Sequence, residues 1–252
     1  MNTPLSPTRN VVLPARPRSD VADAPARAIS RIDPVSIGHE DRMLSNFPIH
    51  LGDLICARRD VKEGEILFFE GGPFNSIFLV FSGSFKGLTH SRSGTETVNR
   101  FYMSGDLLAM EGITTGVHRS RLVALESSQI YVIPFHEFER VALRSPGLLR
   151  DFNRIMSDEI DHAHVIMALR VGPAEMRVAG FLADLSSQFA ARGLSATRFS
   201  LSMSRREIAS YLGMTTETVS RTLTKFRENG LLFVRNREME IFSLARLRQL
   251  AS

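Results

Sequence analysis

The sequence predicts an α+β protein with an N-terminal antiparallel β domain, a long helix and a C-terminal winged helix-turn-helix. Three observations support this fold class. Short apolar runs separated by glycine-bearing turns recur from residue 51 to 134, a texture typical of an antiparallel sandwich or barrel. Apolar residues then follow a helical period from 145 to 169. Finally, two short helical patterns are separated by Gly213.

The composition is that of an ordinary globular chain with two domains. Of its 252 residues, 43% are hydrophobic and 23% are charged, so the chain can bury a core without disulfides or metals. A single cysteine, Cys56, excludes a disulfide framework and any site built from several thiolates. No apolar run approaches about 18 residues, so we expect no membrane span, and a cytoplasmic location fits best.

Positive charge is concentrated in the last third of the chain. From Arg170 to the end there are 13 Lys and Arg against 7 Asp and Glu, whereas the whole chain carries +4. Such a surplus fits either a solvated basic face or a surface that binds a polyanion. Charge alone leaves both interpretations open.

Changes in composition divide the chain into four segments. Residues 1–34 hold six of the 11 prolines and few large apolar side chains, so we expect a mobile arm there. The β domain is predicted over 35–144, a helix over 145–170, and the helix-turn-helix domain over 171–252. A Gly-Pro pair at 172–173 marks the last boundary, because proline breaks one helix and is favoured at the start of the next.

A narrow apolar stripe runs along the helix predicted over 145–170. Its members are three or four residues apart: Leu149, Phe152, Met156, Ile160, Ala163 and Met167. Such a helix can lie on the sheet or pair with the same helix of a second subunit. We favour a homodimer, because the helix is long for a small domain and the small Ala163 lets two backbones approach closely.

The segment from 202 to 230 has the pattern of a helix-turn-helix. Ser204 and Glu207 have capping-box spacing, so a helix should begin at Ser204 and stop at Gly213. Thr215 or Thr216 then caps a second helix, which ends near residue 230. Two short helices joined by a glycine-containing turn are typical of DNA-binding proteins.

The second helix has an apolar inward face and a polar outward face. Glu217, Ser220 and Arg221 are predicted to meet base edges, because glutamate accepts a hydrogen bond from cytosine N4 and arginine donates two to guanine. The alternative is an i,i+4 salt bridge between Glu217 and Arg221, worth about 0.3–0.5 kcal/mol. Residues predicted to contact the DNA backbone or to assist are Thr215, Thr216, Thr224 and Lys225 and, in a following hairpin interpreted as a wing, Arg235 and Arg237.

This layout, with E-T-V-S-R at 217–221, resembles the Crp/Fnr superfamily of bacterial transcription regulators and in particular its Fnr branch. The resemblance covers roughly residues 45–250 and includes K-E-G-E-I-L-F at 62–68 and G-D at 105–106. It implies a cyclic-nucleotide-binding-like β-roll, a homodimer along the long helix, contact with RNA polymerase, and a regulator rather than an enzyme. It also implies binding to double-stranded DNA at an inverted repeat of TTGAT-type half-sites, read by Glu217, Ser220 and Arg221.

The chain departs from this family where its members sense effectors. Oxygen-sensing members hold an iron–sulfur cluster through four cysteines, and Cys56 alone cannot ligate one, so we expect no cluster. In the family's cyclic-nucleotide pocket a Gly-Glu pair contacts the ribose and a downstream Arg-Ser pair contacts the phosphate. Here Ala109 and Met110 occupy the first place, whereas Arg119 and Ser120 match the second. We therefore expect no cyclic nucleotide, and keep Arg119 and Ser120 as candidate pocket residues.

Two alternatives to a DNA-binding regulator without an effector stay open. One is a regulator that responds to a small, cyclic-nucleotide-like ligand in the β-roll pocket. The other is a cupin-like metalloenzyme, which needs His and Glu ligands converging in the barrel, where only His90 and His118 are scattered. The seven histidines show no metal-binding spacing, so they are interpreted as ordinary surface residues and no metal site is predicted.

Overall fold

The computed structural model describes residues 34–36, 55–91 and 94–251. The arm predicted over 1–34 lies outside these residues except for Pro34, which begins a strand. Cys56 belongs to a described strand. Within these ranges, no helix has both the length and the apolar character that crossing a membrane requires.

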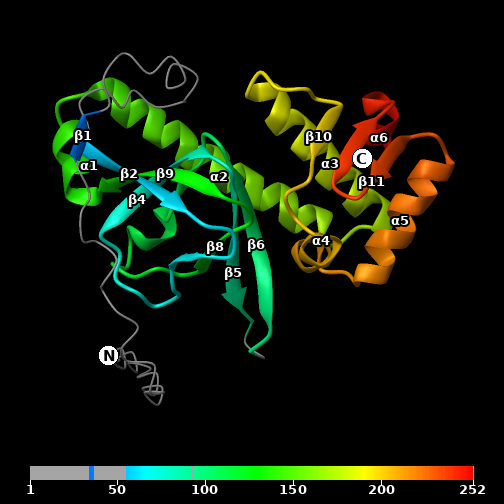
Figure 1. Ribbon diagram of the computed structural model, residues 1–252, viewed down its shortest axis with the longest axis horizontal. Helices are drawn as coiled ribbons and strands as arrows, with labels where there is room; N and C mark the ends of the chain where they lie inside the picture. Colours follow the sequence, from blue (N-terminus) through cyan, green and yellow to red (C-terminus); the bar gives the residue numbers. More distant parts are fainter. Residues whose placement is uncertain (1–33, 37–54, 92–93, 252) are drawn as a thin grey trace, which may run out of the picture. The chain divides into compact units, whose positions relative to one another are not determined.

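The N-terminal half is an antiparallel β-roll made of two sheets (Figure 1). The first sheet has the strand order β1 (Pro34–Ser36), β2 (Ile55–Val61), β9 (Ser128–Pro134), β4 (Ser76–Ser82) and β7 (Leu107–Leu108). The second has the order β3 (Ile66–Phe68), β8 (Arg121–Ala124), β5 (Ser84–His90) and β6 (Glu96–Met103). The predicted antiparallel β class is confirmed, and the apolar runs of the sequence form these strands.

The two sheets enclose a core of fully buried aliphatic and aromatic side chains, including Val80, Phe85, Leu108 and Ile130. The chain passes from one sheet to the other at Gly83, between β4 and β5. Gly83 has a φ of 87°, and a Cβ at this position would lie 2.1 Å from Ser128 Oγ. Only glycine therefore fits this crossing, because the left-handed conformation and the close approach both exclude a side chain.

Two helices follow the roll, α1 (Phe135–Ala142) and the long α2 (Pro146–Leu169). Ser145 caps α2, since its Oγ accepts a hydrogen bond from Leu148 N at 3.3 Å, and Pro146 stands where a missing N–H costs nothing. The buried residues of α2 are Leu148, Ile166 and Leu169, near its two ends. The long helix predicted from the apolar period is thus present.

The C-terminal part is a winged helix-turn-helix, as predicted (Figure 1). Its helices are α3 (Ala174–Ala191), α4 (Arg205–Leu212), α5 (Thr216–Glu228) and α6 (Leu244–Ala251). Its strands β10 (Arg198–Ser200), β12 (Glu238–Ile241) and β11 (Leu232–Arg235) form one sheet in that order. The sequence predicted the hairpin of β11 and β12 but neither the short strand β10 nor α6, although Ser243 caps α6 by accepting a hydrogen bond from the Arg246 amide at 3.3 Å.

Helix α4 also packs against the β5–β6 hairpin of the roll. The Val98 amide donates to Ser210 Oγ at 3.0 Å, and Lys86 Nζ donates to the Glu207 carboxylate. Phe101 of β6 lies against Tyr211, with ring centroids 5.0 Å apart. The first helix of the helix-turn-helix is therefore held both by its own domain and by the β-roll.

Candidate nucleic-acid interface

Helix α4 begins with the predicted capping box. Ser204 Oγ accepts a hydrogen bond from the Glu207 amide at 3.3 Å, and the Glu207 carboxylate accepts one from the Ser204 amide at 2.6 Å. Burial tends to raise the pKa of Glu207, but the bonds from Lys86 and Ser204 outweigh it and hold that pKa below its ordinary value. Gly213 ends the helix in the left-handed region, with a φ of 66°. The start of α4 and the turn toward α5 are thus fixed by local contacts.

The turn between α4 and α5 is held by Arg177 of α3, a residue that sequence reasoning missed. Its Nε donates to Gly172 O at 2.7 Å, and its Nη1 donates to Leu212 O and Gly213 O, each at 3.2 Å. Carbonyls at a helix end have no helical N–H to accept from, so a guanidinium satisfies them. No local pattern could reveal this role, because 35 residues separate Arg177 from Leu212.

Helix α5 has one buried face and one solvent face. Thr215 is its N-cap, since Thr215 Oγ1 accepts a hydrogen bond from the Thr218 amide at 3.2 Å. The residues that pack inward are Val219, Thr222, Leu223 and Phe226. Glu217 and Arg221 are exposed, and Ser220 is half-buried. The three residues predicted to read bases therefore lie on the surface of this helix.

The alternative of an i,i+4 salt bridge is not realised in this structure. Among the described residues, neither Glu217 nor Arg221 has an ion-pair partner, although the two are one helical turn apart. The carboxylate and the guanidinium are both free to form hydrogen bonds outside the chain. A glutamate in the N-terminal turn of a helix also interacts favourably with the helix dipole.

The residues predicted to assist DNA binding differ in how exposed they are and in whether they already form an ion pair. Arg235 and Arg237 are exposed at the tip of the β11–β12 hairpin, where Asn236 takes a left-handed φ of 56°. Thr216 and Thr224 are half-buried on α5. Lys225 is exposed, but its Nζ forms an ion pair with Glu175 of α3. A phosphate contact by Lys225 therefore requires this pair to open.

The apolar stripe of α2 divides into two sets. Phe152 and Met156 are half-buried and pack against the core of the β-roll. Leu149, Ile160 and Met167 are 45%, 56% and 67% exposed, and Ala163 is exposed as well. Part of the stripe thus covers the roll, and the rest leaves a row of apolar side chains facing solvent.

The two candidate pocket residues of the β-roll, Arg119 and Ser120, differ in burial and in hydrogen bonding. Ser120 is buried and its hydroxyl donates to Glu111 Oε1 at 3.0 Å, whereas Arg119 is exposed. Burial raises the pKa of Glu111. Ala109, which precedes the 3-10 turn Met110–Gly112, has a strained left-handed φ of 72°. The Glu111 carboxylate, one residue beyond the expected Gly-Glu place, is therefore engaged by Ser120.

One histidine is buried and another is half-buried, contrary to the interpretation of all histidines as ordinary surface residues. His118 is 5% exposed and stacks on Phe68 at 3.8 Å between ring centroids. His162 of α2 is half-buried, and its Nε2 lies 2.9 Å from the hydroxyl of Tyr211 on α4. Among the described residues, no three His, Cys, Asp or Glu side chains gather as metal ligands.

Comparison with known proteins matches both halves of the chain to described domains. Residues 58–145 match the cyclic nucleotide-binding domain, and residues 176–250 match the Crp-like helix-turn-helix domain. The transcriptional activator protein Anr of Pseudomonas protegens is 39% identical over 202 residues, which cover 80% of this chain and 83% of that protein. The fumarate and nitrate reduction regulatory protein of Escherichia coli is 36% identical, over 80% of this chain and 81% of that protein.

A solved structure shares the same fold. FixK2 from Bradyrhizobium japonicum aligns with a TM-score of 0.72 and 26% identity, over 79% of this chain and 98% of that chain. The matched proteins are transcription regulators and not enzymes, so the cupin-like metalloenzyme is excluded as an interpretation.

Proposed function

This chain belongs to the Crp/Fnr family of transcription regulators, and we propose that it binds an inverted repeat of TTGAT-type half-sites in double-stranded DNA as a homodimer. The main support for this proposal is the surface of α5. Glu217, Ser220 and Arg221 lie on the solvent face of α5, and the described structure gives the two charged side chains no internal ion pair. A helix with such a face, following a capped α4, has the geometry of a recognition helix in a major groove.

The chemistry of these side chains matches neighbouring base pairs. The Glu217 carboxylate can accept a hydrogen bond from cytosine N4, and the Arg221 guanidinium can donate two to guanine O6 and N7. Ser220, between them on the same face, can reach a base edge or a phosphate oxygen. We propose that Arg235 and Arg237, which are exposed at the wing tip, contact the phosphate backbone; such contacts position a domain without specifying sequence.

A two-fold symmetric dimer is supported by the exposed part of the α2 stripe. Leu149, Ile160, Ala163 and Met167 follow one another at intervals of 11, three and four residues, which are spacings found along the seam of a coiled coil. Pairing this helix with its copy removes these side chains from water, which stabilises the dimer by roughly 25 cal/mol for each Å² of apolar surface buried. Two recognition helices are then available for the two halves of an inverted repeat.

We propose that the protein holds no iron–sulfur cluster. The 252 residues contain one cysteine, and such clusters are held by four protein ligands, mostly thiolates. We also propose a cytoplasmic location and contact with RNA polymerase, the latter by resemblance to the family. Neither requires a cofactor.

The decisive experiment measures DNA affinity of Arg221→Ala by fluorescence anisotropy on a TTGAT-type inverted repeat. We expect a loss of about 1–3 kcal/mol in binding free energy and relaxed specificity at one base pair of each half-site. Arg227→Ala is the matched control, because Arg227 is an exposed arginine on α5 but lies six residues further on, and so on a different face. Equal affinity of Arg221→Ala and the parent protein for the repeat would refute the base-reading assignment.

A ligand-responsive regulator is the second candidate, favoured by the match of residues 58–145 to the cyclic nucleotide-binding domain. Its candidate site is formed by Ser120, Glu111 and the exposed Arg119. Titration of the protein with cyclic AMP in a calorimeter tests this candidate. Heat that is absent from Arg119→Ala supports it, whereas no heat from the parent protein leaves the first proposal as the better one.

A further inference from the structure

The helix-turn-helix domain covers the free edge of β6 in the β-roll. β6 is the last strand of its sheet, so one side of its backbone has no neighbouring strand among the described residues. Val98 is 3% exposed and uses this side. Its N–H donates to Ser210 Oγ of α4 at 3.0 Å, and its carbonyl accepts from Arg170 Nη2 at 3.3 Å. Because buried backbone groups at a sheet edge need such partners, α4 and the residue that follows α2 are both fixed to this strand.

Ionic and apolar contacts extend this attachment along α4. Lys86 of β5 donates to the carboxylate of Glu207, and the two side chains are only 21% and 19% exposed. Phe101 of β6 packs against Tyr211 of α4, with ring centroids 5.0 Å apart. Phe101 and Val98 belong to one apolar core with buried side chains of α3, α4 and α5. We call these contacts the α4–β6 interface; its members are Lys86, Val98, Phe101, Glu207, Ser210 and Tyr211.

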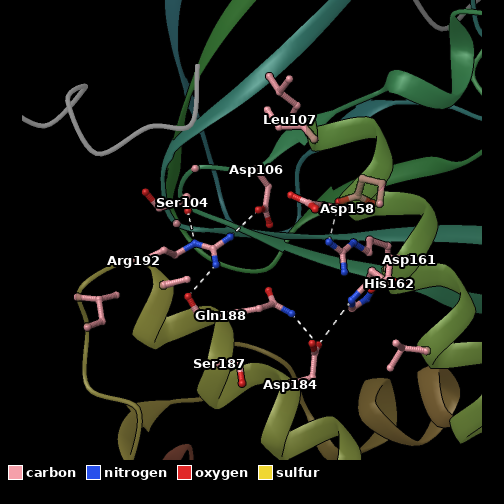
Figure 2. Close-up of a pocket in the computed structure, with 18 of the residues that line it drawn as sticks. Ser104, Asp106, Leu107, Asp158, Asp161, His162, Asp184, Ser187, Gln188 and Arg192 are labelled. Carbon is pink, nitrogen blue, oxygen red and sulfur yellow. Dashed lines mark hydrogen bonds and ion pairs between the residues drawn. The ribbon is translucent and has the colours of Figure 1, made fainter. Parts of the chain in front are cut away.

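A second attachment joins the end of α3 to the β-roll (Figure 2). The Nε of Arg192, the residue after α3, donates to Ser104 O at 2.6 Å, and its Nη2 pairs with Asp106 Oδ1 at 2.5 Å. The Asp106 carboxylate also accepts a hydrogen bond from the Met103 amide at 2.8 Å, which holds it in place. One attachment on α4 and another at the end of α3 together resist rotation of the helix-turn-helix domain about either point.

The position of the recognition helix α5 follows from these attachments. Glu207 lies in the first turn of α4 and Ser210 in the second, so α4 is held along its length. The turn from α4 into α5 is held by Arg177, whose Nη1 donates to the carbonyls of Leu212 and Gly213. No long loop therefore separates α5 from the β-roll, and α5 is held at one place relative to α2.

We propose that the α4–β6 interface and Arg192 determine which spacing between the two half-sites of an inverted repeat the protein accepts. This inference rests on the proposed function, since it requires a homodimer that reads two half-sites. Adding one base pair between the half-sites moves one of them by about 3.4 Å and rotates it by about 34–36° relative to the other. With both recognition helices fixed, the DNA must twist or bend to restore contact, which weakens binding. Lys86, Ser210 and Arg192 thus act as positioning residues that do not touch DNA.

Fluorescence anisotropy with the full chain tests this on two kinds of DNA duplex. One kind holds a single TTGAT-type half-site, and the other holds an inverted repeat whose central gap is varied one base pair at a time. We expect the parent protein to bind one gap best and the neighbouring gaps at least about tenfold more weakly. The double variant Lys86→Ala with Ser210→Ala should bind the single half-site within about twofold of the parent but distinguish neighbouring gaps by less than about threefold. Arg192→Ala, at the second attachment, should show the same loss of gap preference.

The matched control is Lys62→Ala with Ser187→Ala, because both side chains are exposed and belong to neither attachment. This control should keep the gap preference of the parent protein. Sedimentation equilibrium should show that all the variants are dimers, because the α2 stripe is unchanged.

The inference alone would be overturned by a variant that binds the half-site as the parent does and also keeps the parent's gap preference. A parent protein that binds all gaps equally would overturn it as well. Weaker half-site binding by both variants would show that these residues support α5 itself rather than its position, and dissociation to monomers would show that they support the dimer. A parent protein that binds neither the half-site nor any repeat would contradict the proposed function, and this inference with it.

Discussion

Replacing His118 with phenylalanine should remove a large part of the acid sensitivity of the β-roll. His118 is buried, stacks on Phe68 at 3.8 Å, and has no hydrogen-bond partner for Nδ1 among the described residues. Burial lowers its pKa from 6.5 to about 4. Below pH 6.5 the unfolded chain therefore binds a proton that the folded chain does not. The free energy of unfolding falls by up to about 1.4 kcal/mol for each pH unit toward pH 4, and this histidine has no effect above pH 6.5.

Phenylalanine keeps the stacking on Phe68 and does not titrate, so His118→Phe should lose this slope and be at least as stable as the parent near neutral pH. The assay is urea unfolding followed by circular dichroism from about pH 7 to about pH 5. Other groups that titrate, including His162, contribute equally to both proteins, and the difference between them isolates His118. Parallel pH profiles for parent and variant would show that His118 is already solvated, and the reasoning from burial would be wrong.

Two further variants test the dimer helix and the turn of the helix-turn-helix. Ile160→Glu places a charge in the exposed part of the α2 stripe and should give a monomer in sedimentation equilibrium. The control is Leu143→Glu, at an 88% exposed site outside α2, which should leave the dimer intact. If Ile160→Glu were still a dimer, subunit pairing along the α2 stripe would be excluded. Arg177→Ala leaves the carbonyls of Gly172, Leu212 and Gly213 without their donor and should lower the free energy of unfolding by about 1.5–3 kcal/mol. Chemical denaturation measures this loss, and a variant as stable as the parent would show that water replaces the guanidinium without cost.

Signals between residues close in sequence made the two helices of the helix-turn-helix, α4 and α5, predictable. The capping box at Ser204, the stop at Gly213 and the cap at Thr215 each involve residues within four positions of one another, so periodicity and spacing place α4 and α5 correctly. The short strand β10 has only three residues and leaves no comparable pattern, whereas α6 has a local signal in its N-cap Ser243 that the prediction did not use. The sequence therefore predicted the motif but only part of the domain around it.

Contacts between distant residues could not be predicted from a single sequence. The stripe of α2 gave no means of telling that Phe152 and Met156 pack on the β-roll while Ile160 faces solvent. Lys225 appeared available for DNA, because its partner Glu175 lies 50 residues away. His162 appeared to be an ordinary surface histidine, although it contacts Tyr211 on another helix.

Tyr211 connects the long helix α2 to α4, the first helix of the helix-turn-helix, through two hydrogen bonds. Its hydroxyl bonds to His162 of α2, and its carbonyl accepts a hydrogen bond at 2.8 Å from Arg170, the residue that follows α2. Tyr211 is also the penultimate residue of α4, two positions before the Gly213 turn that leads into α5. If α2 rotates, either these two hydrogen bonds break or α4 and the Gly213 turn move together with α2. Tyr211 therefore couples the orientation of α2, the helix proposed to pair two subunits, to the position of α4 and of the turn that leads into α5.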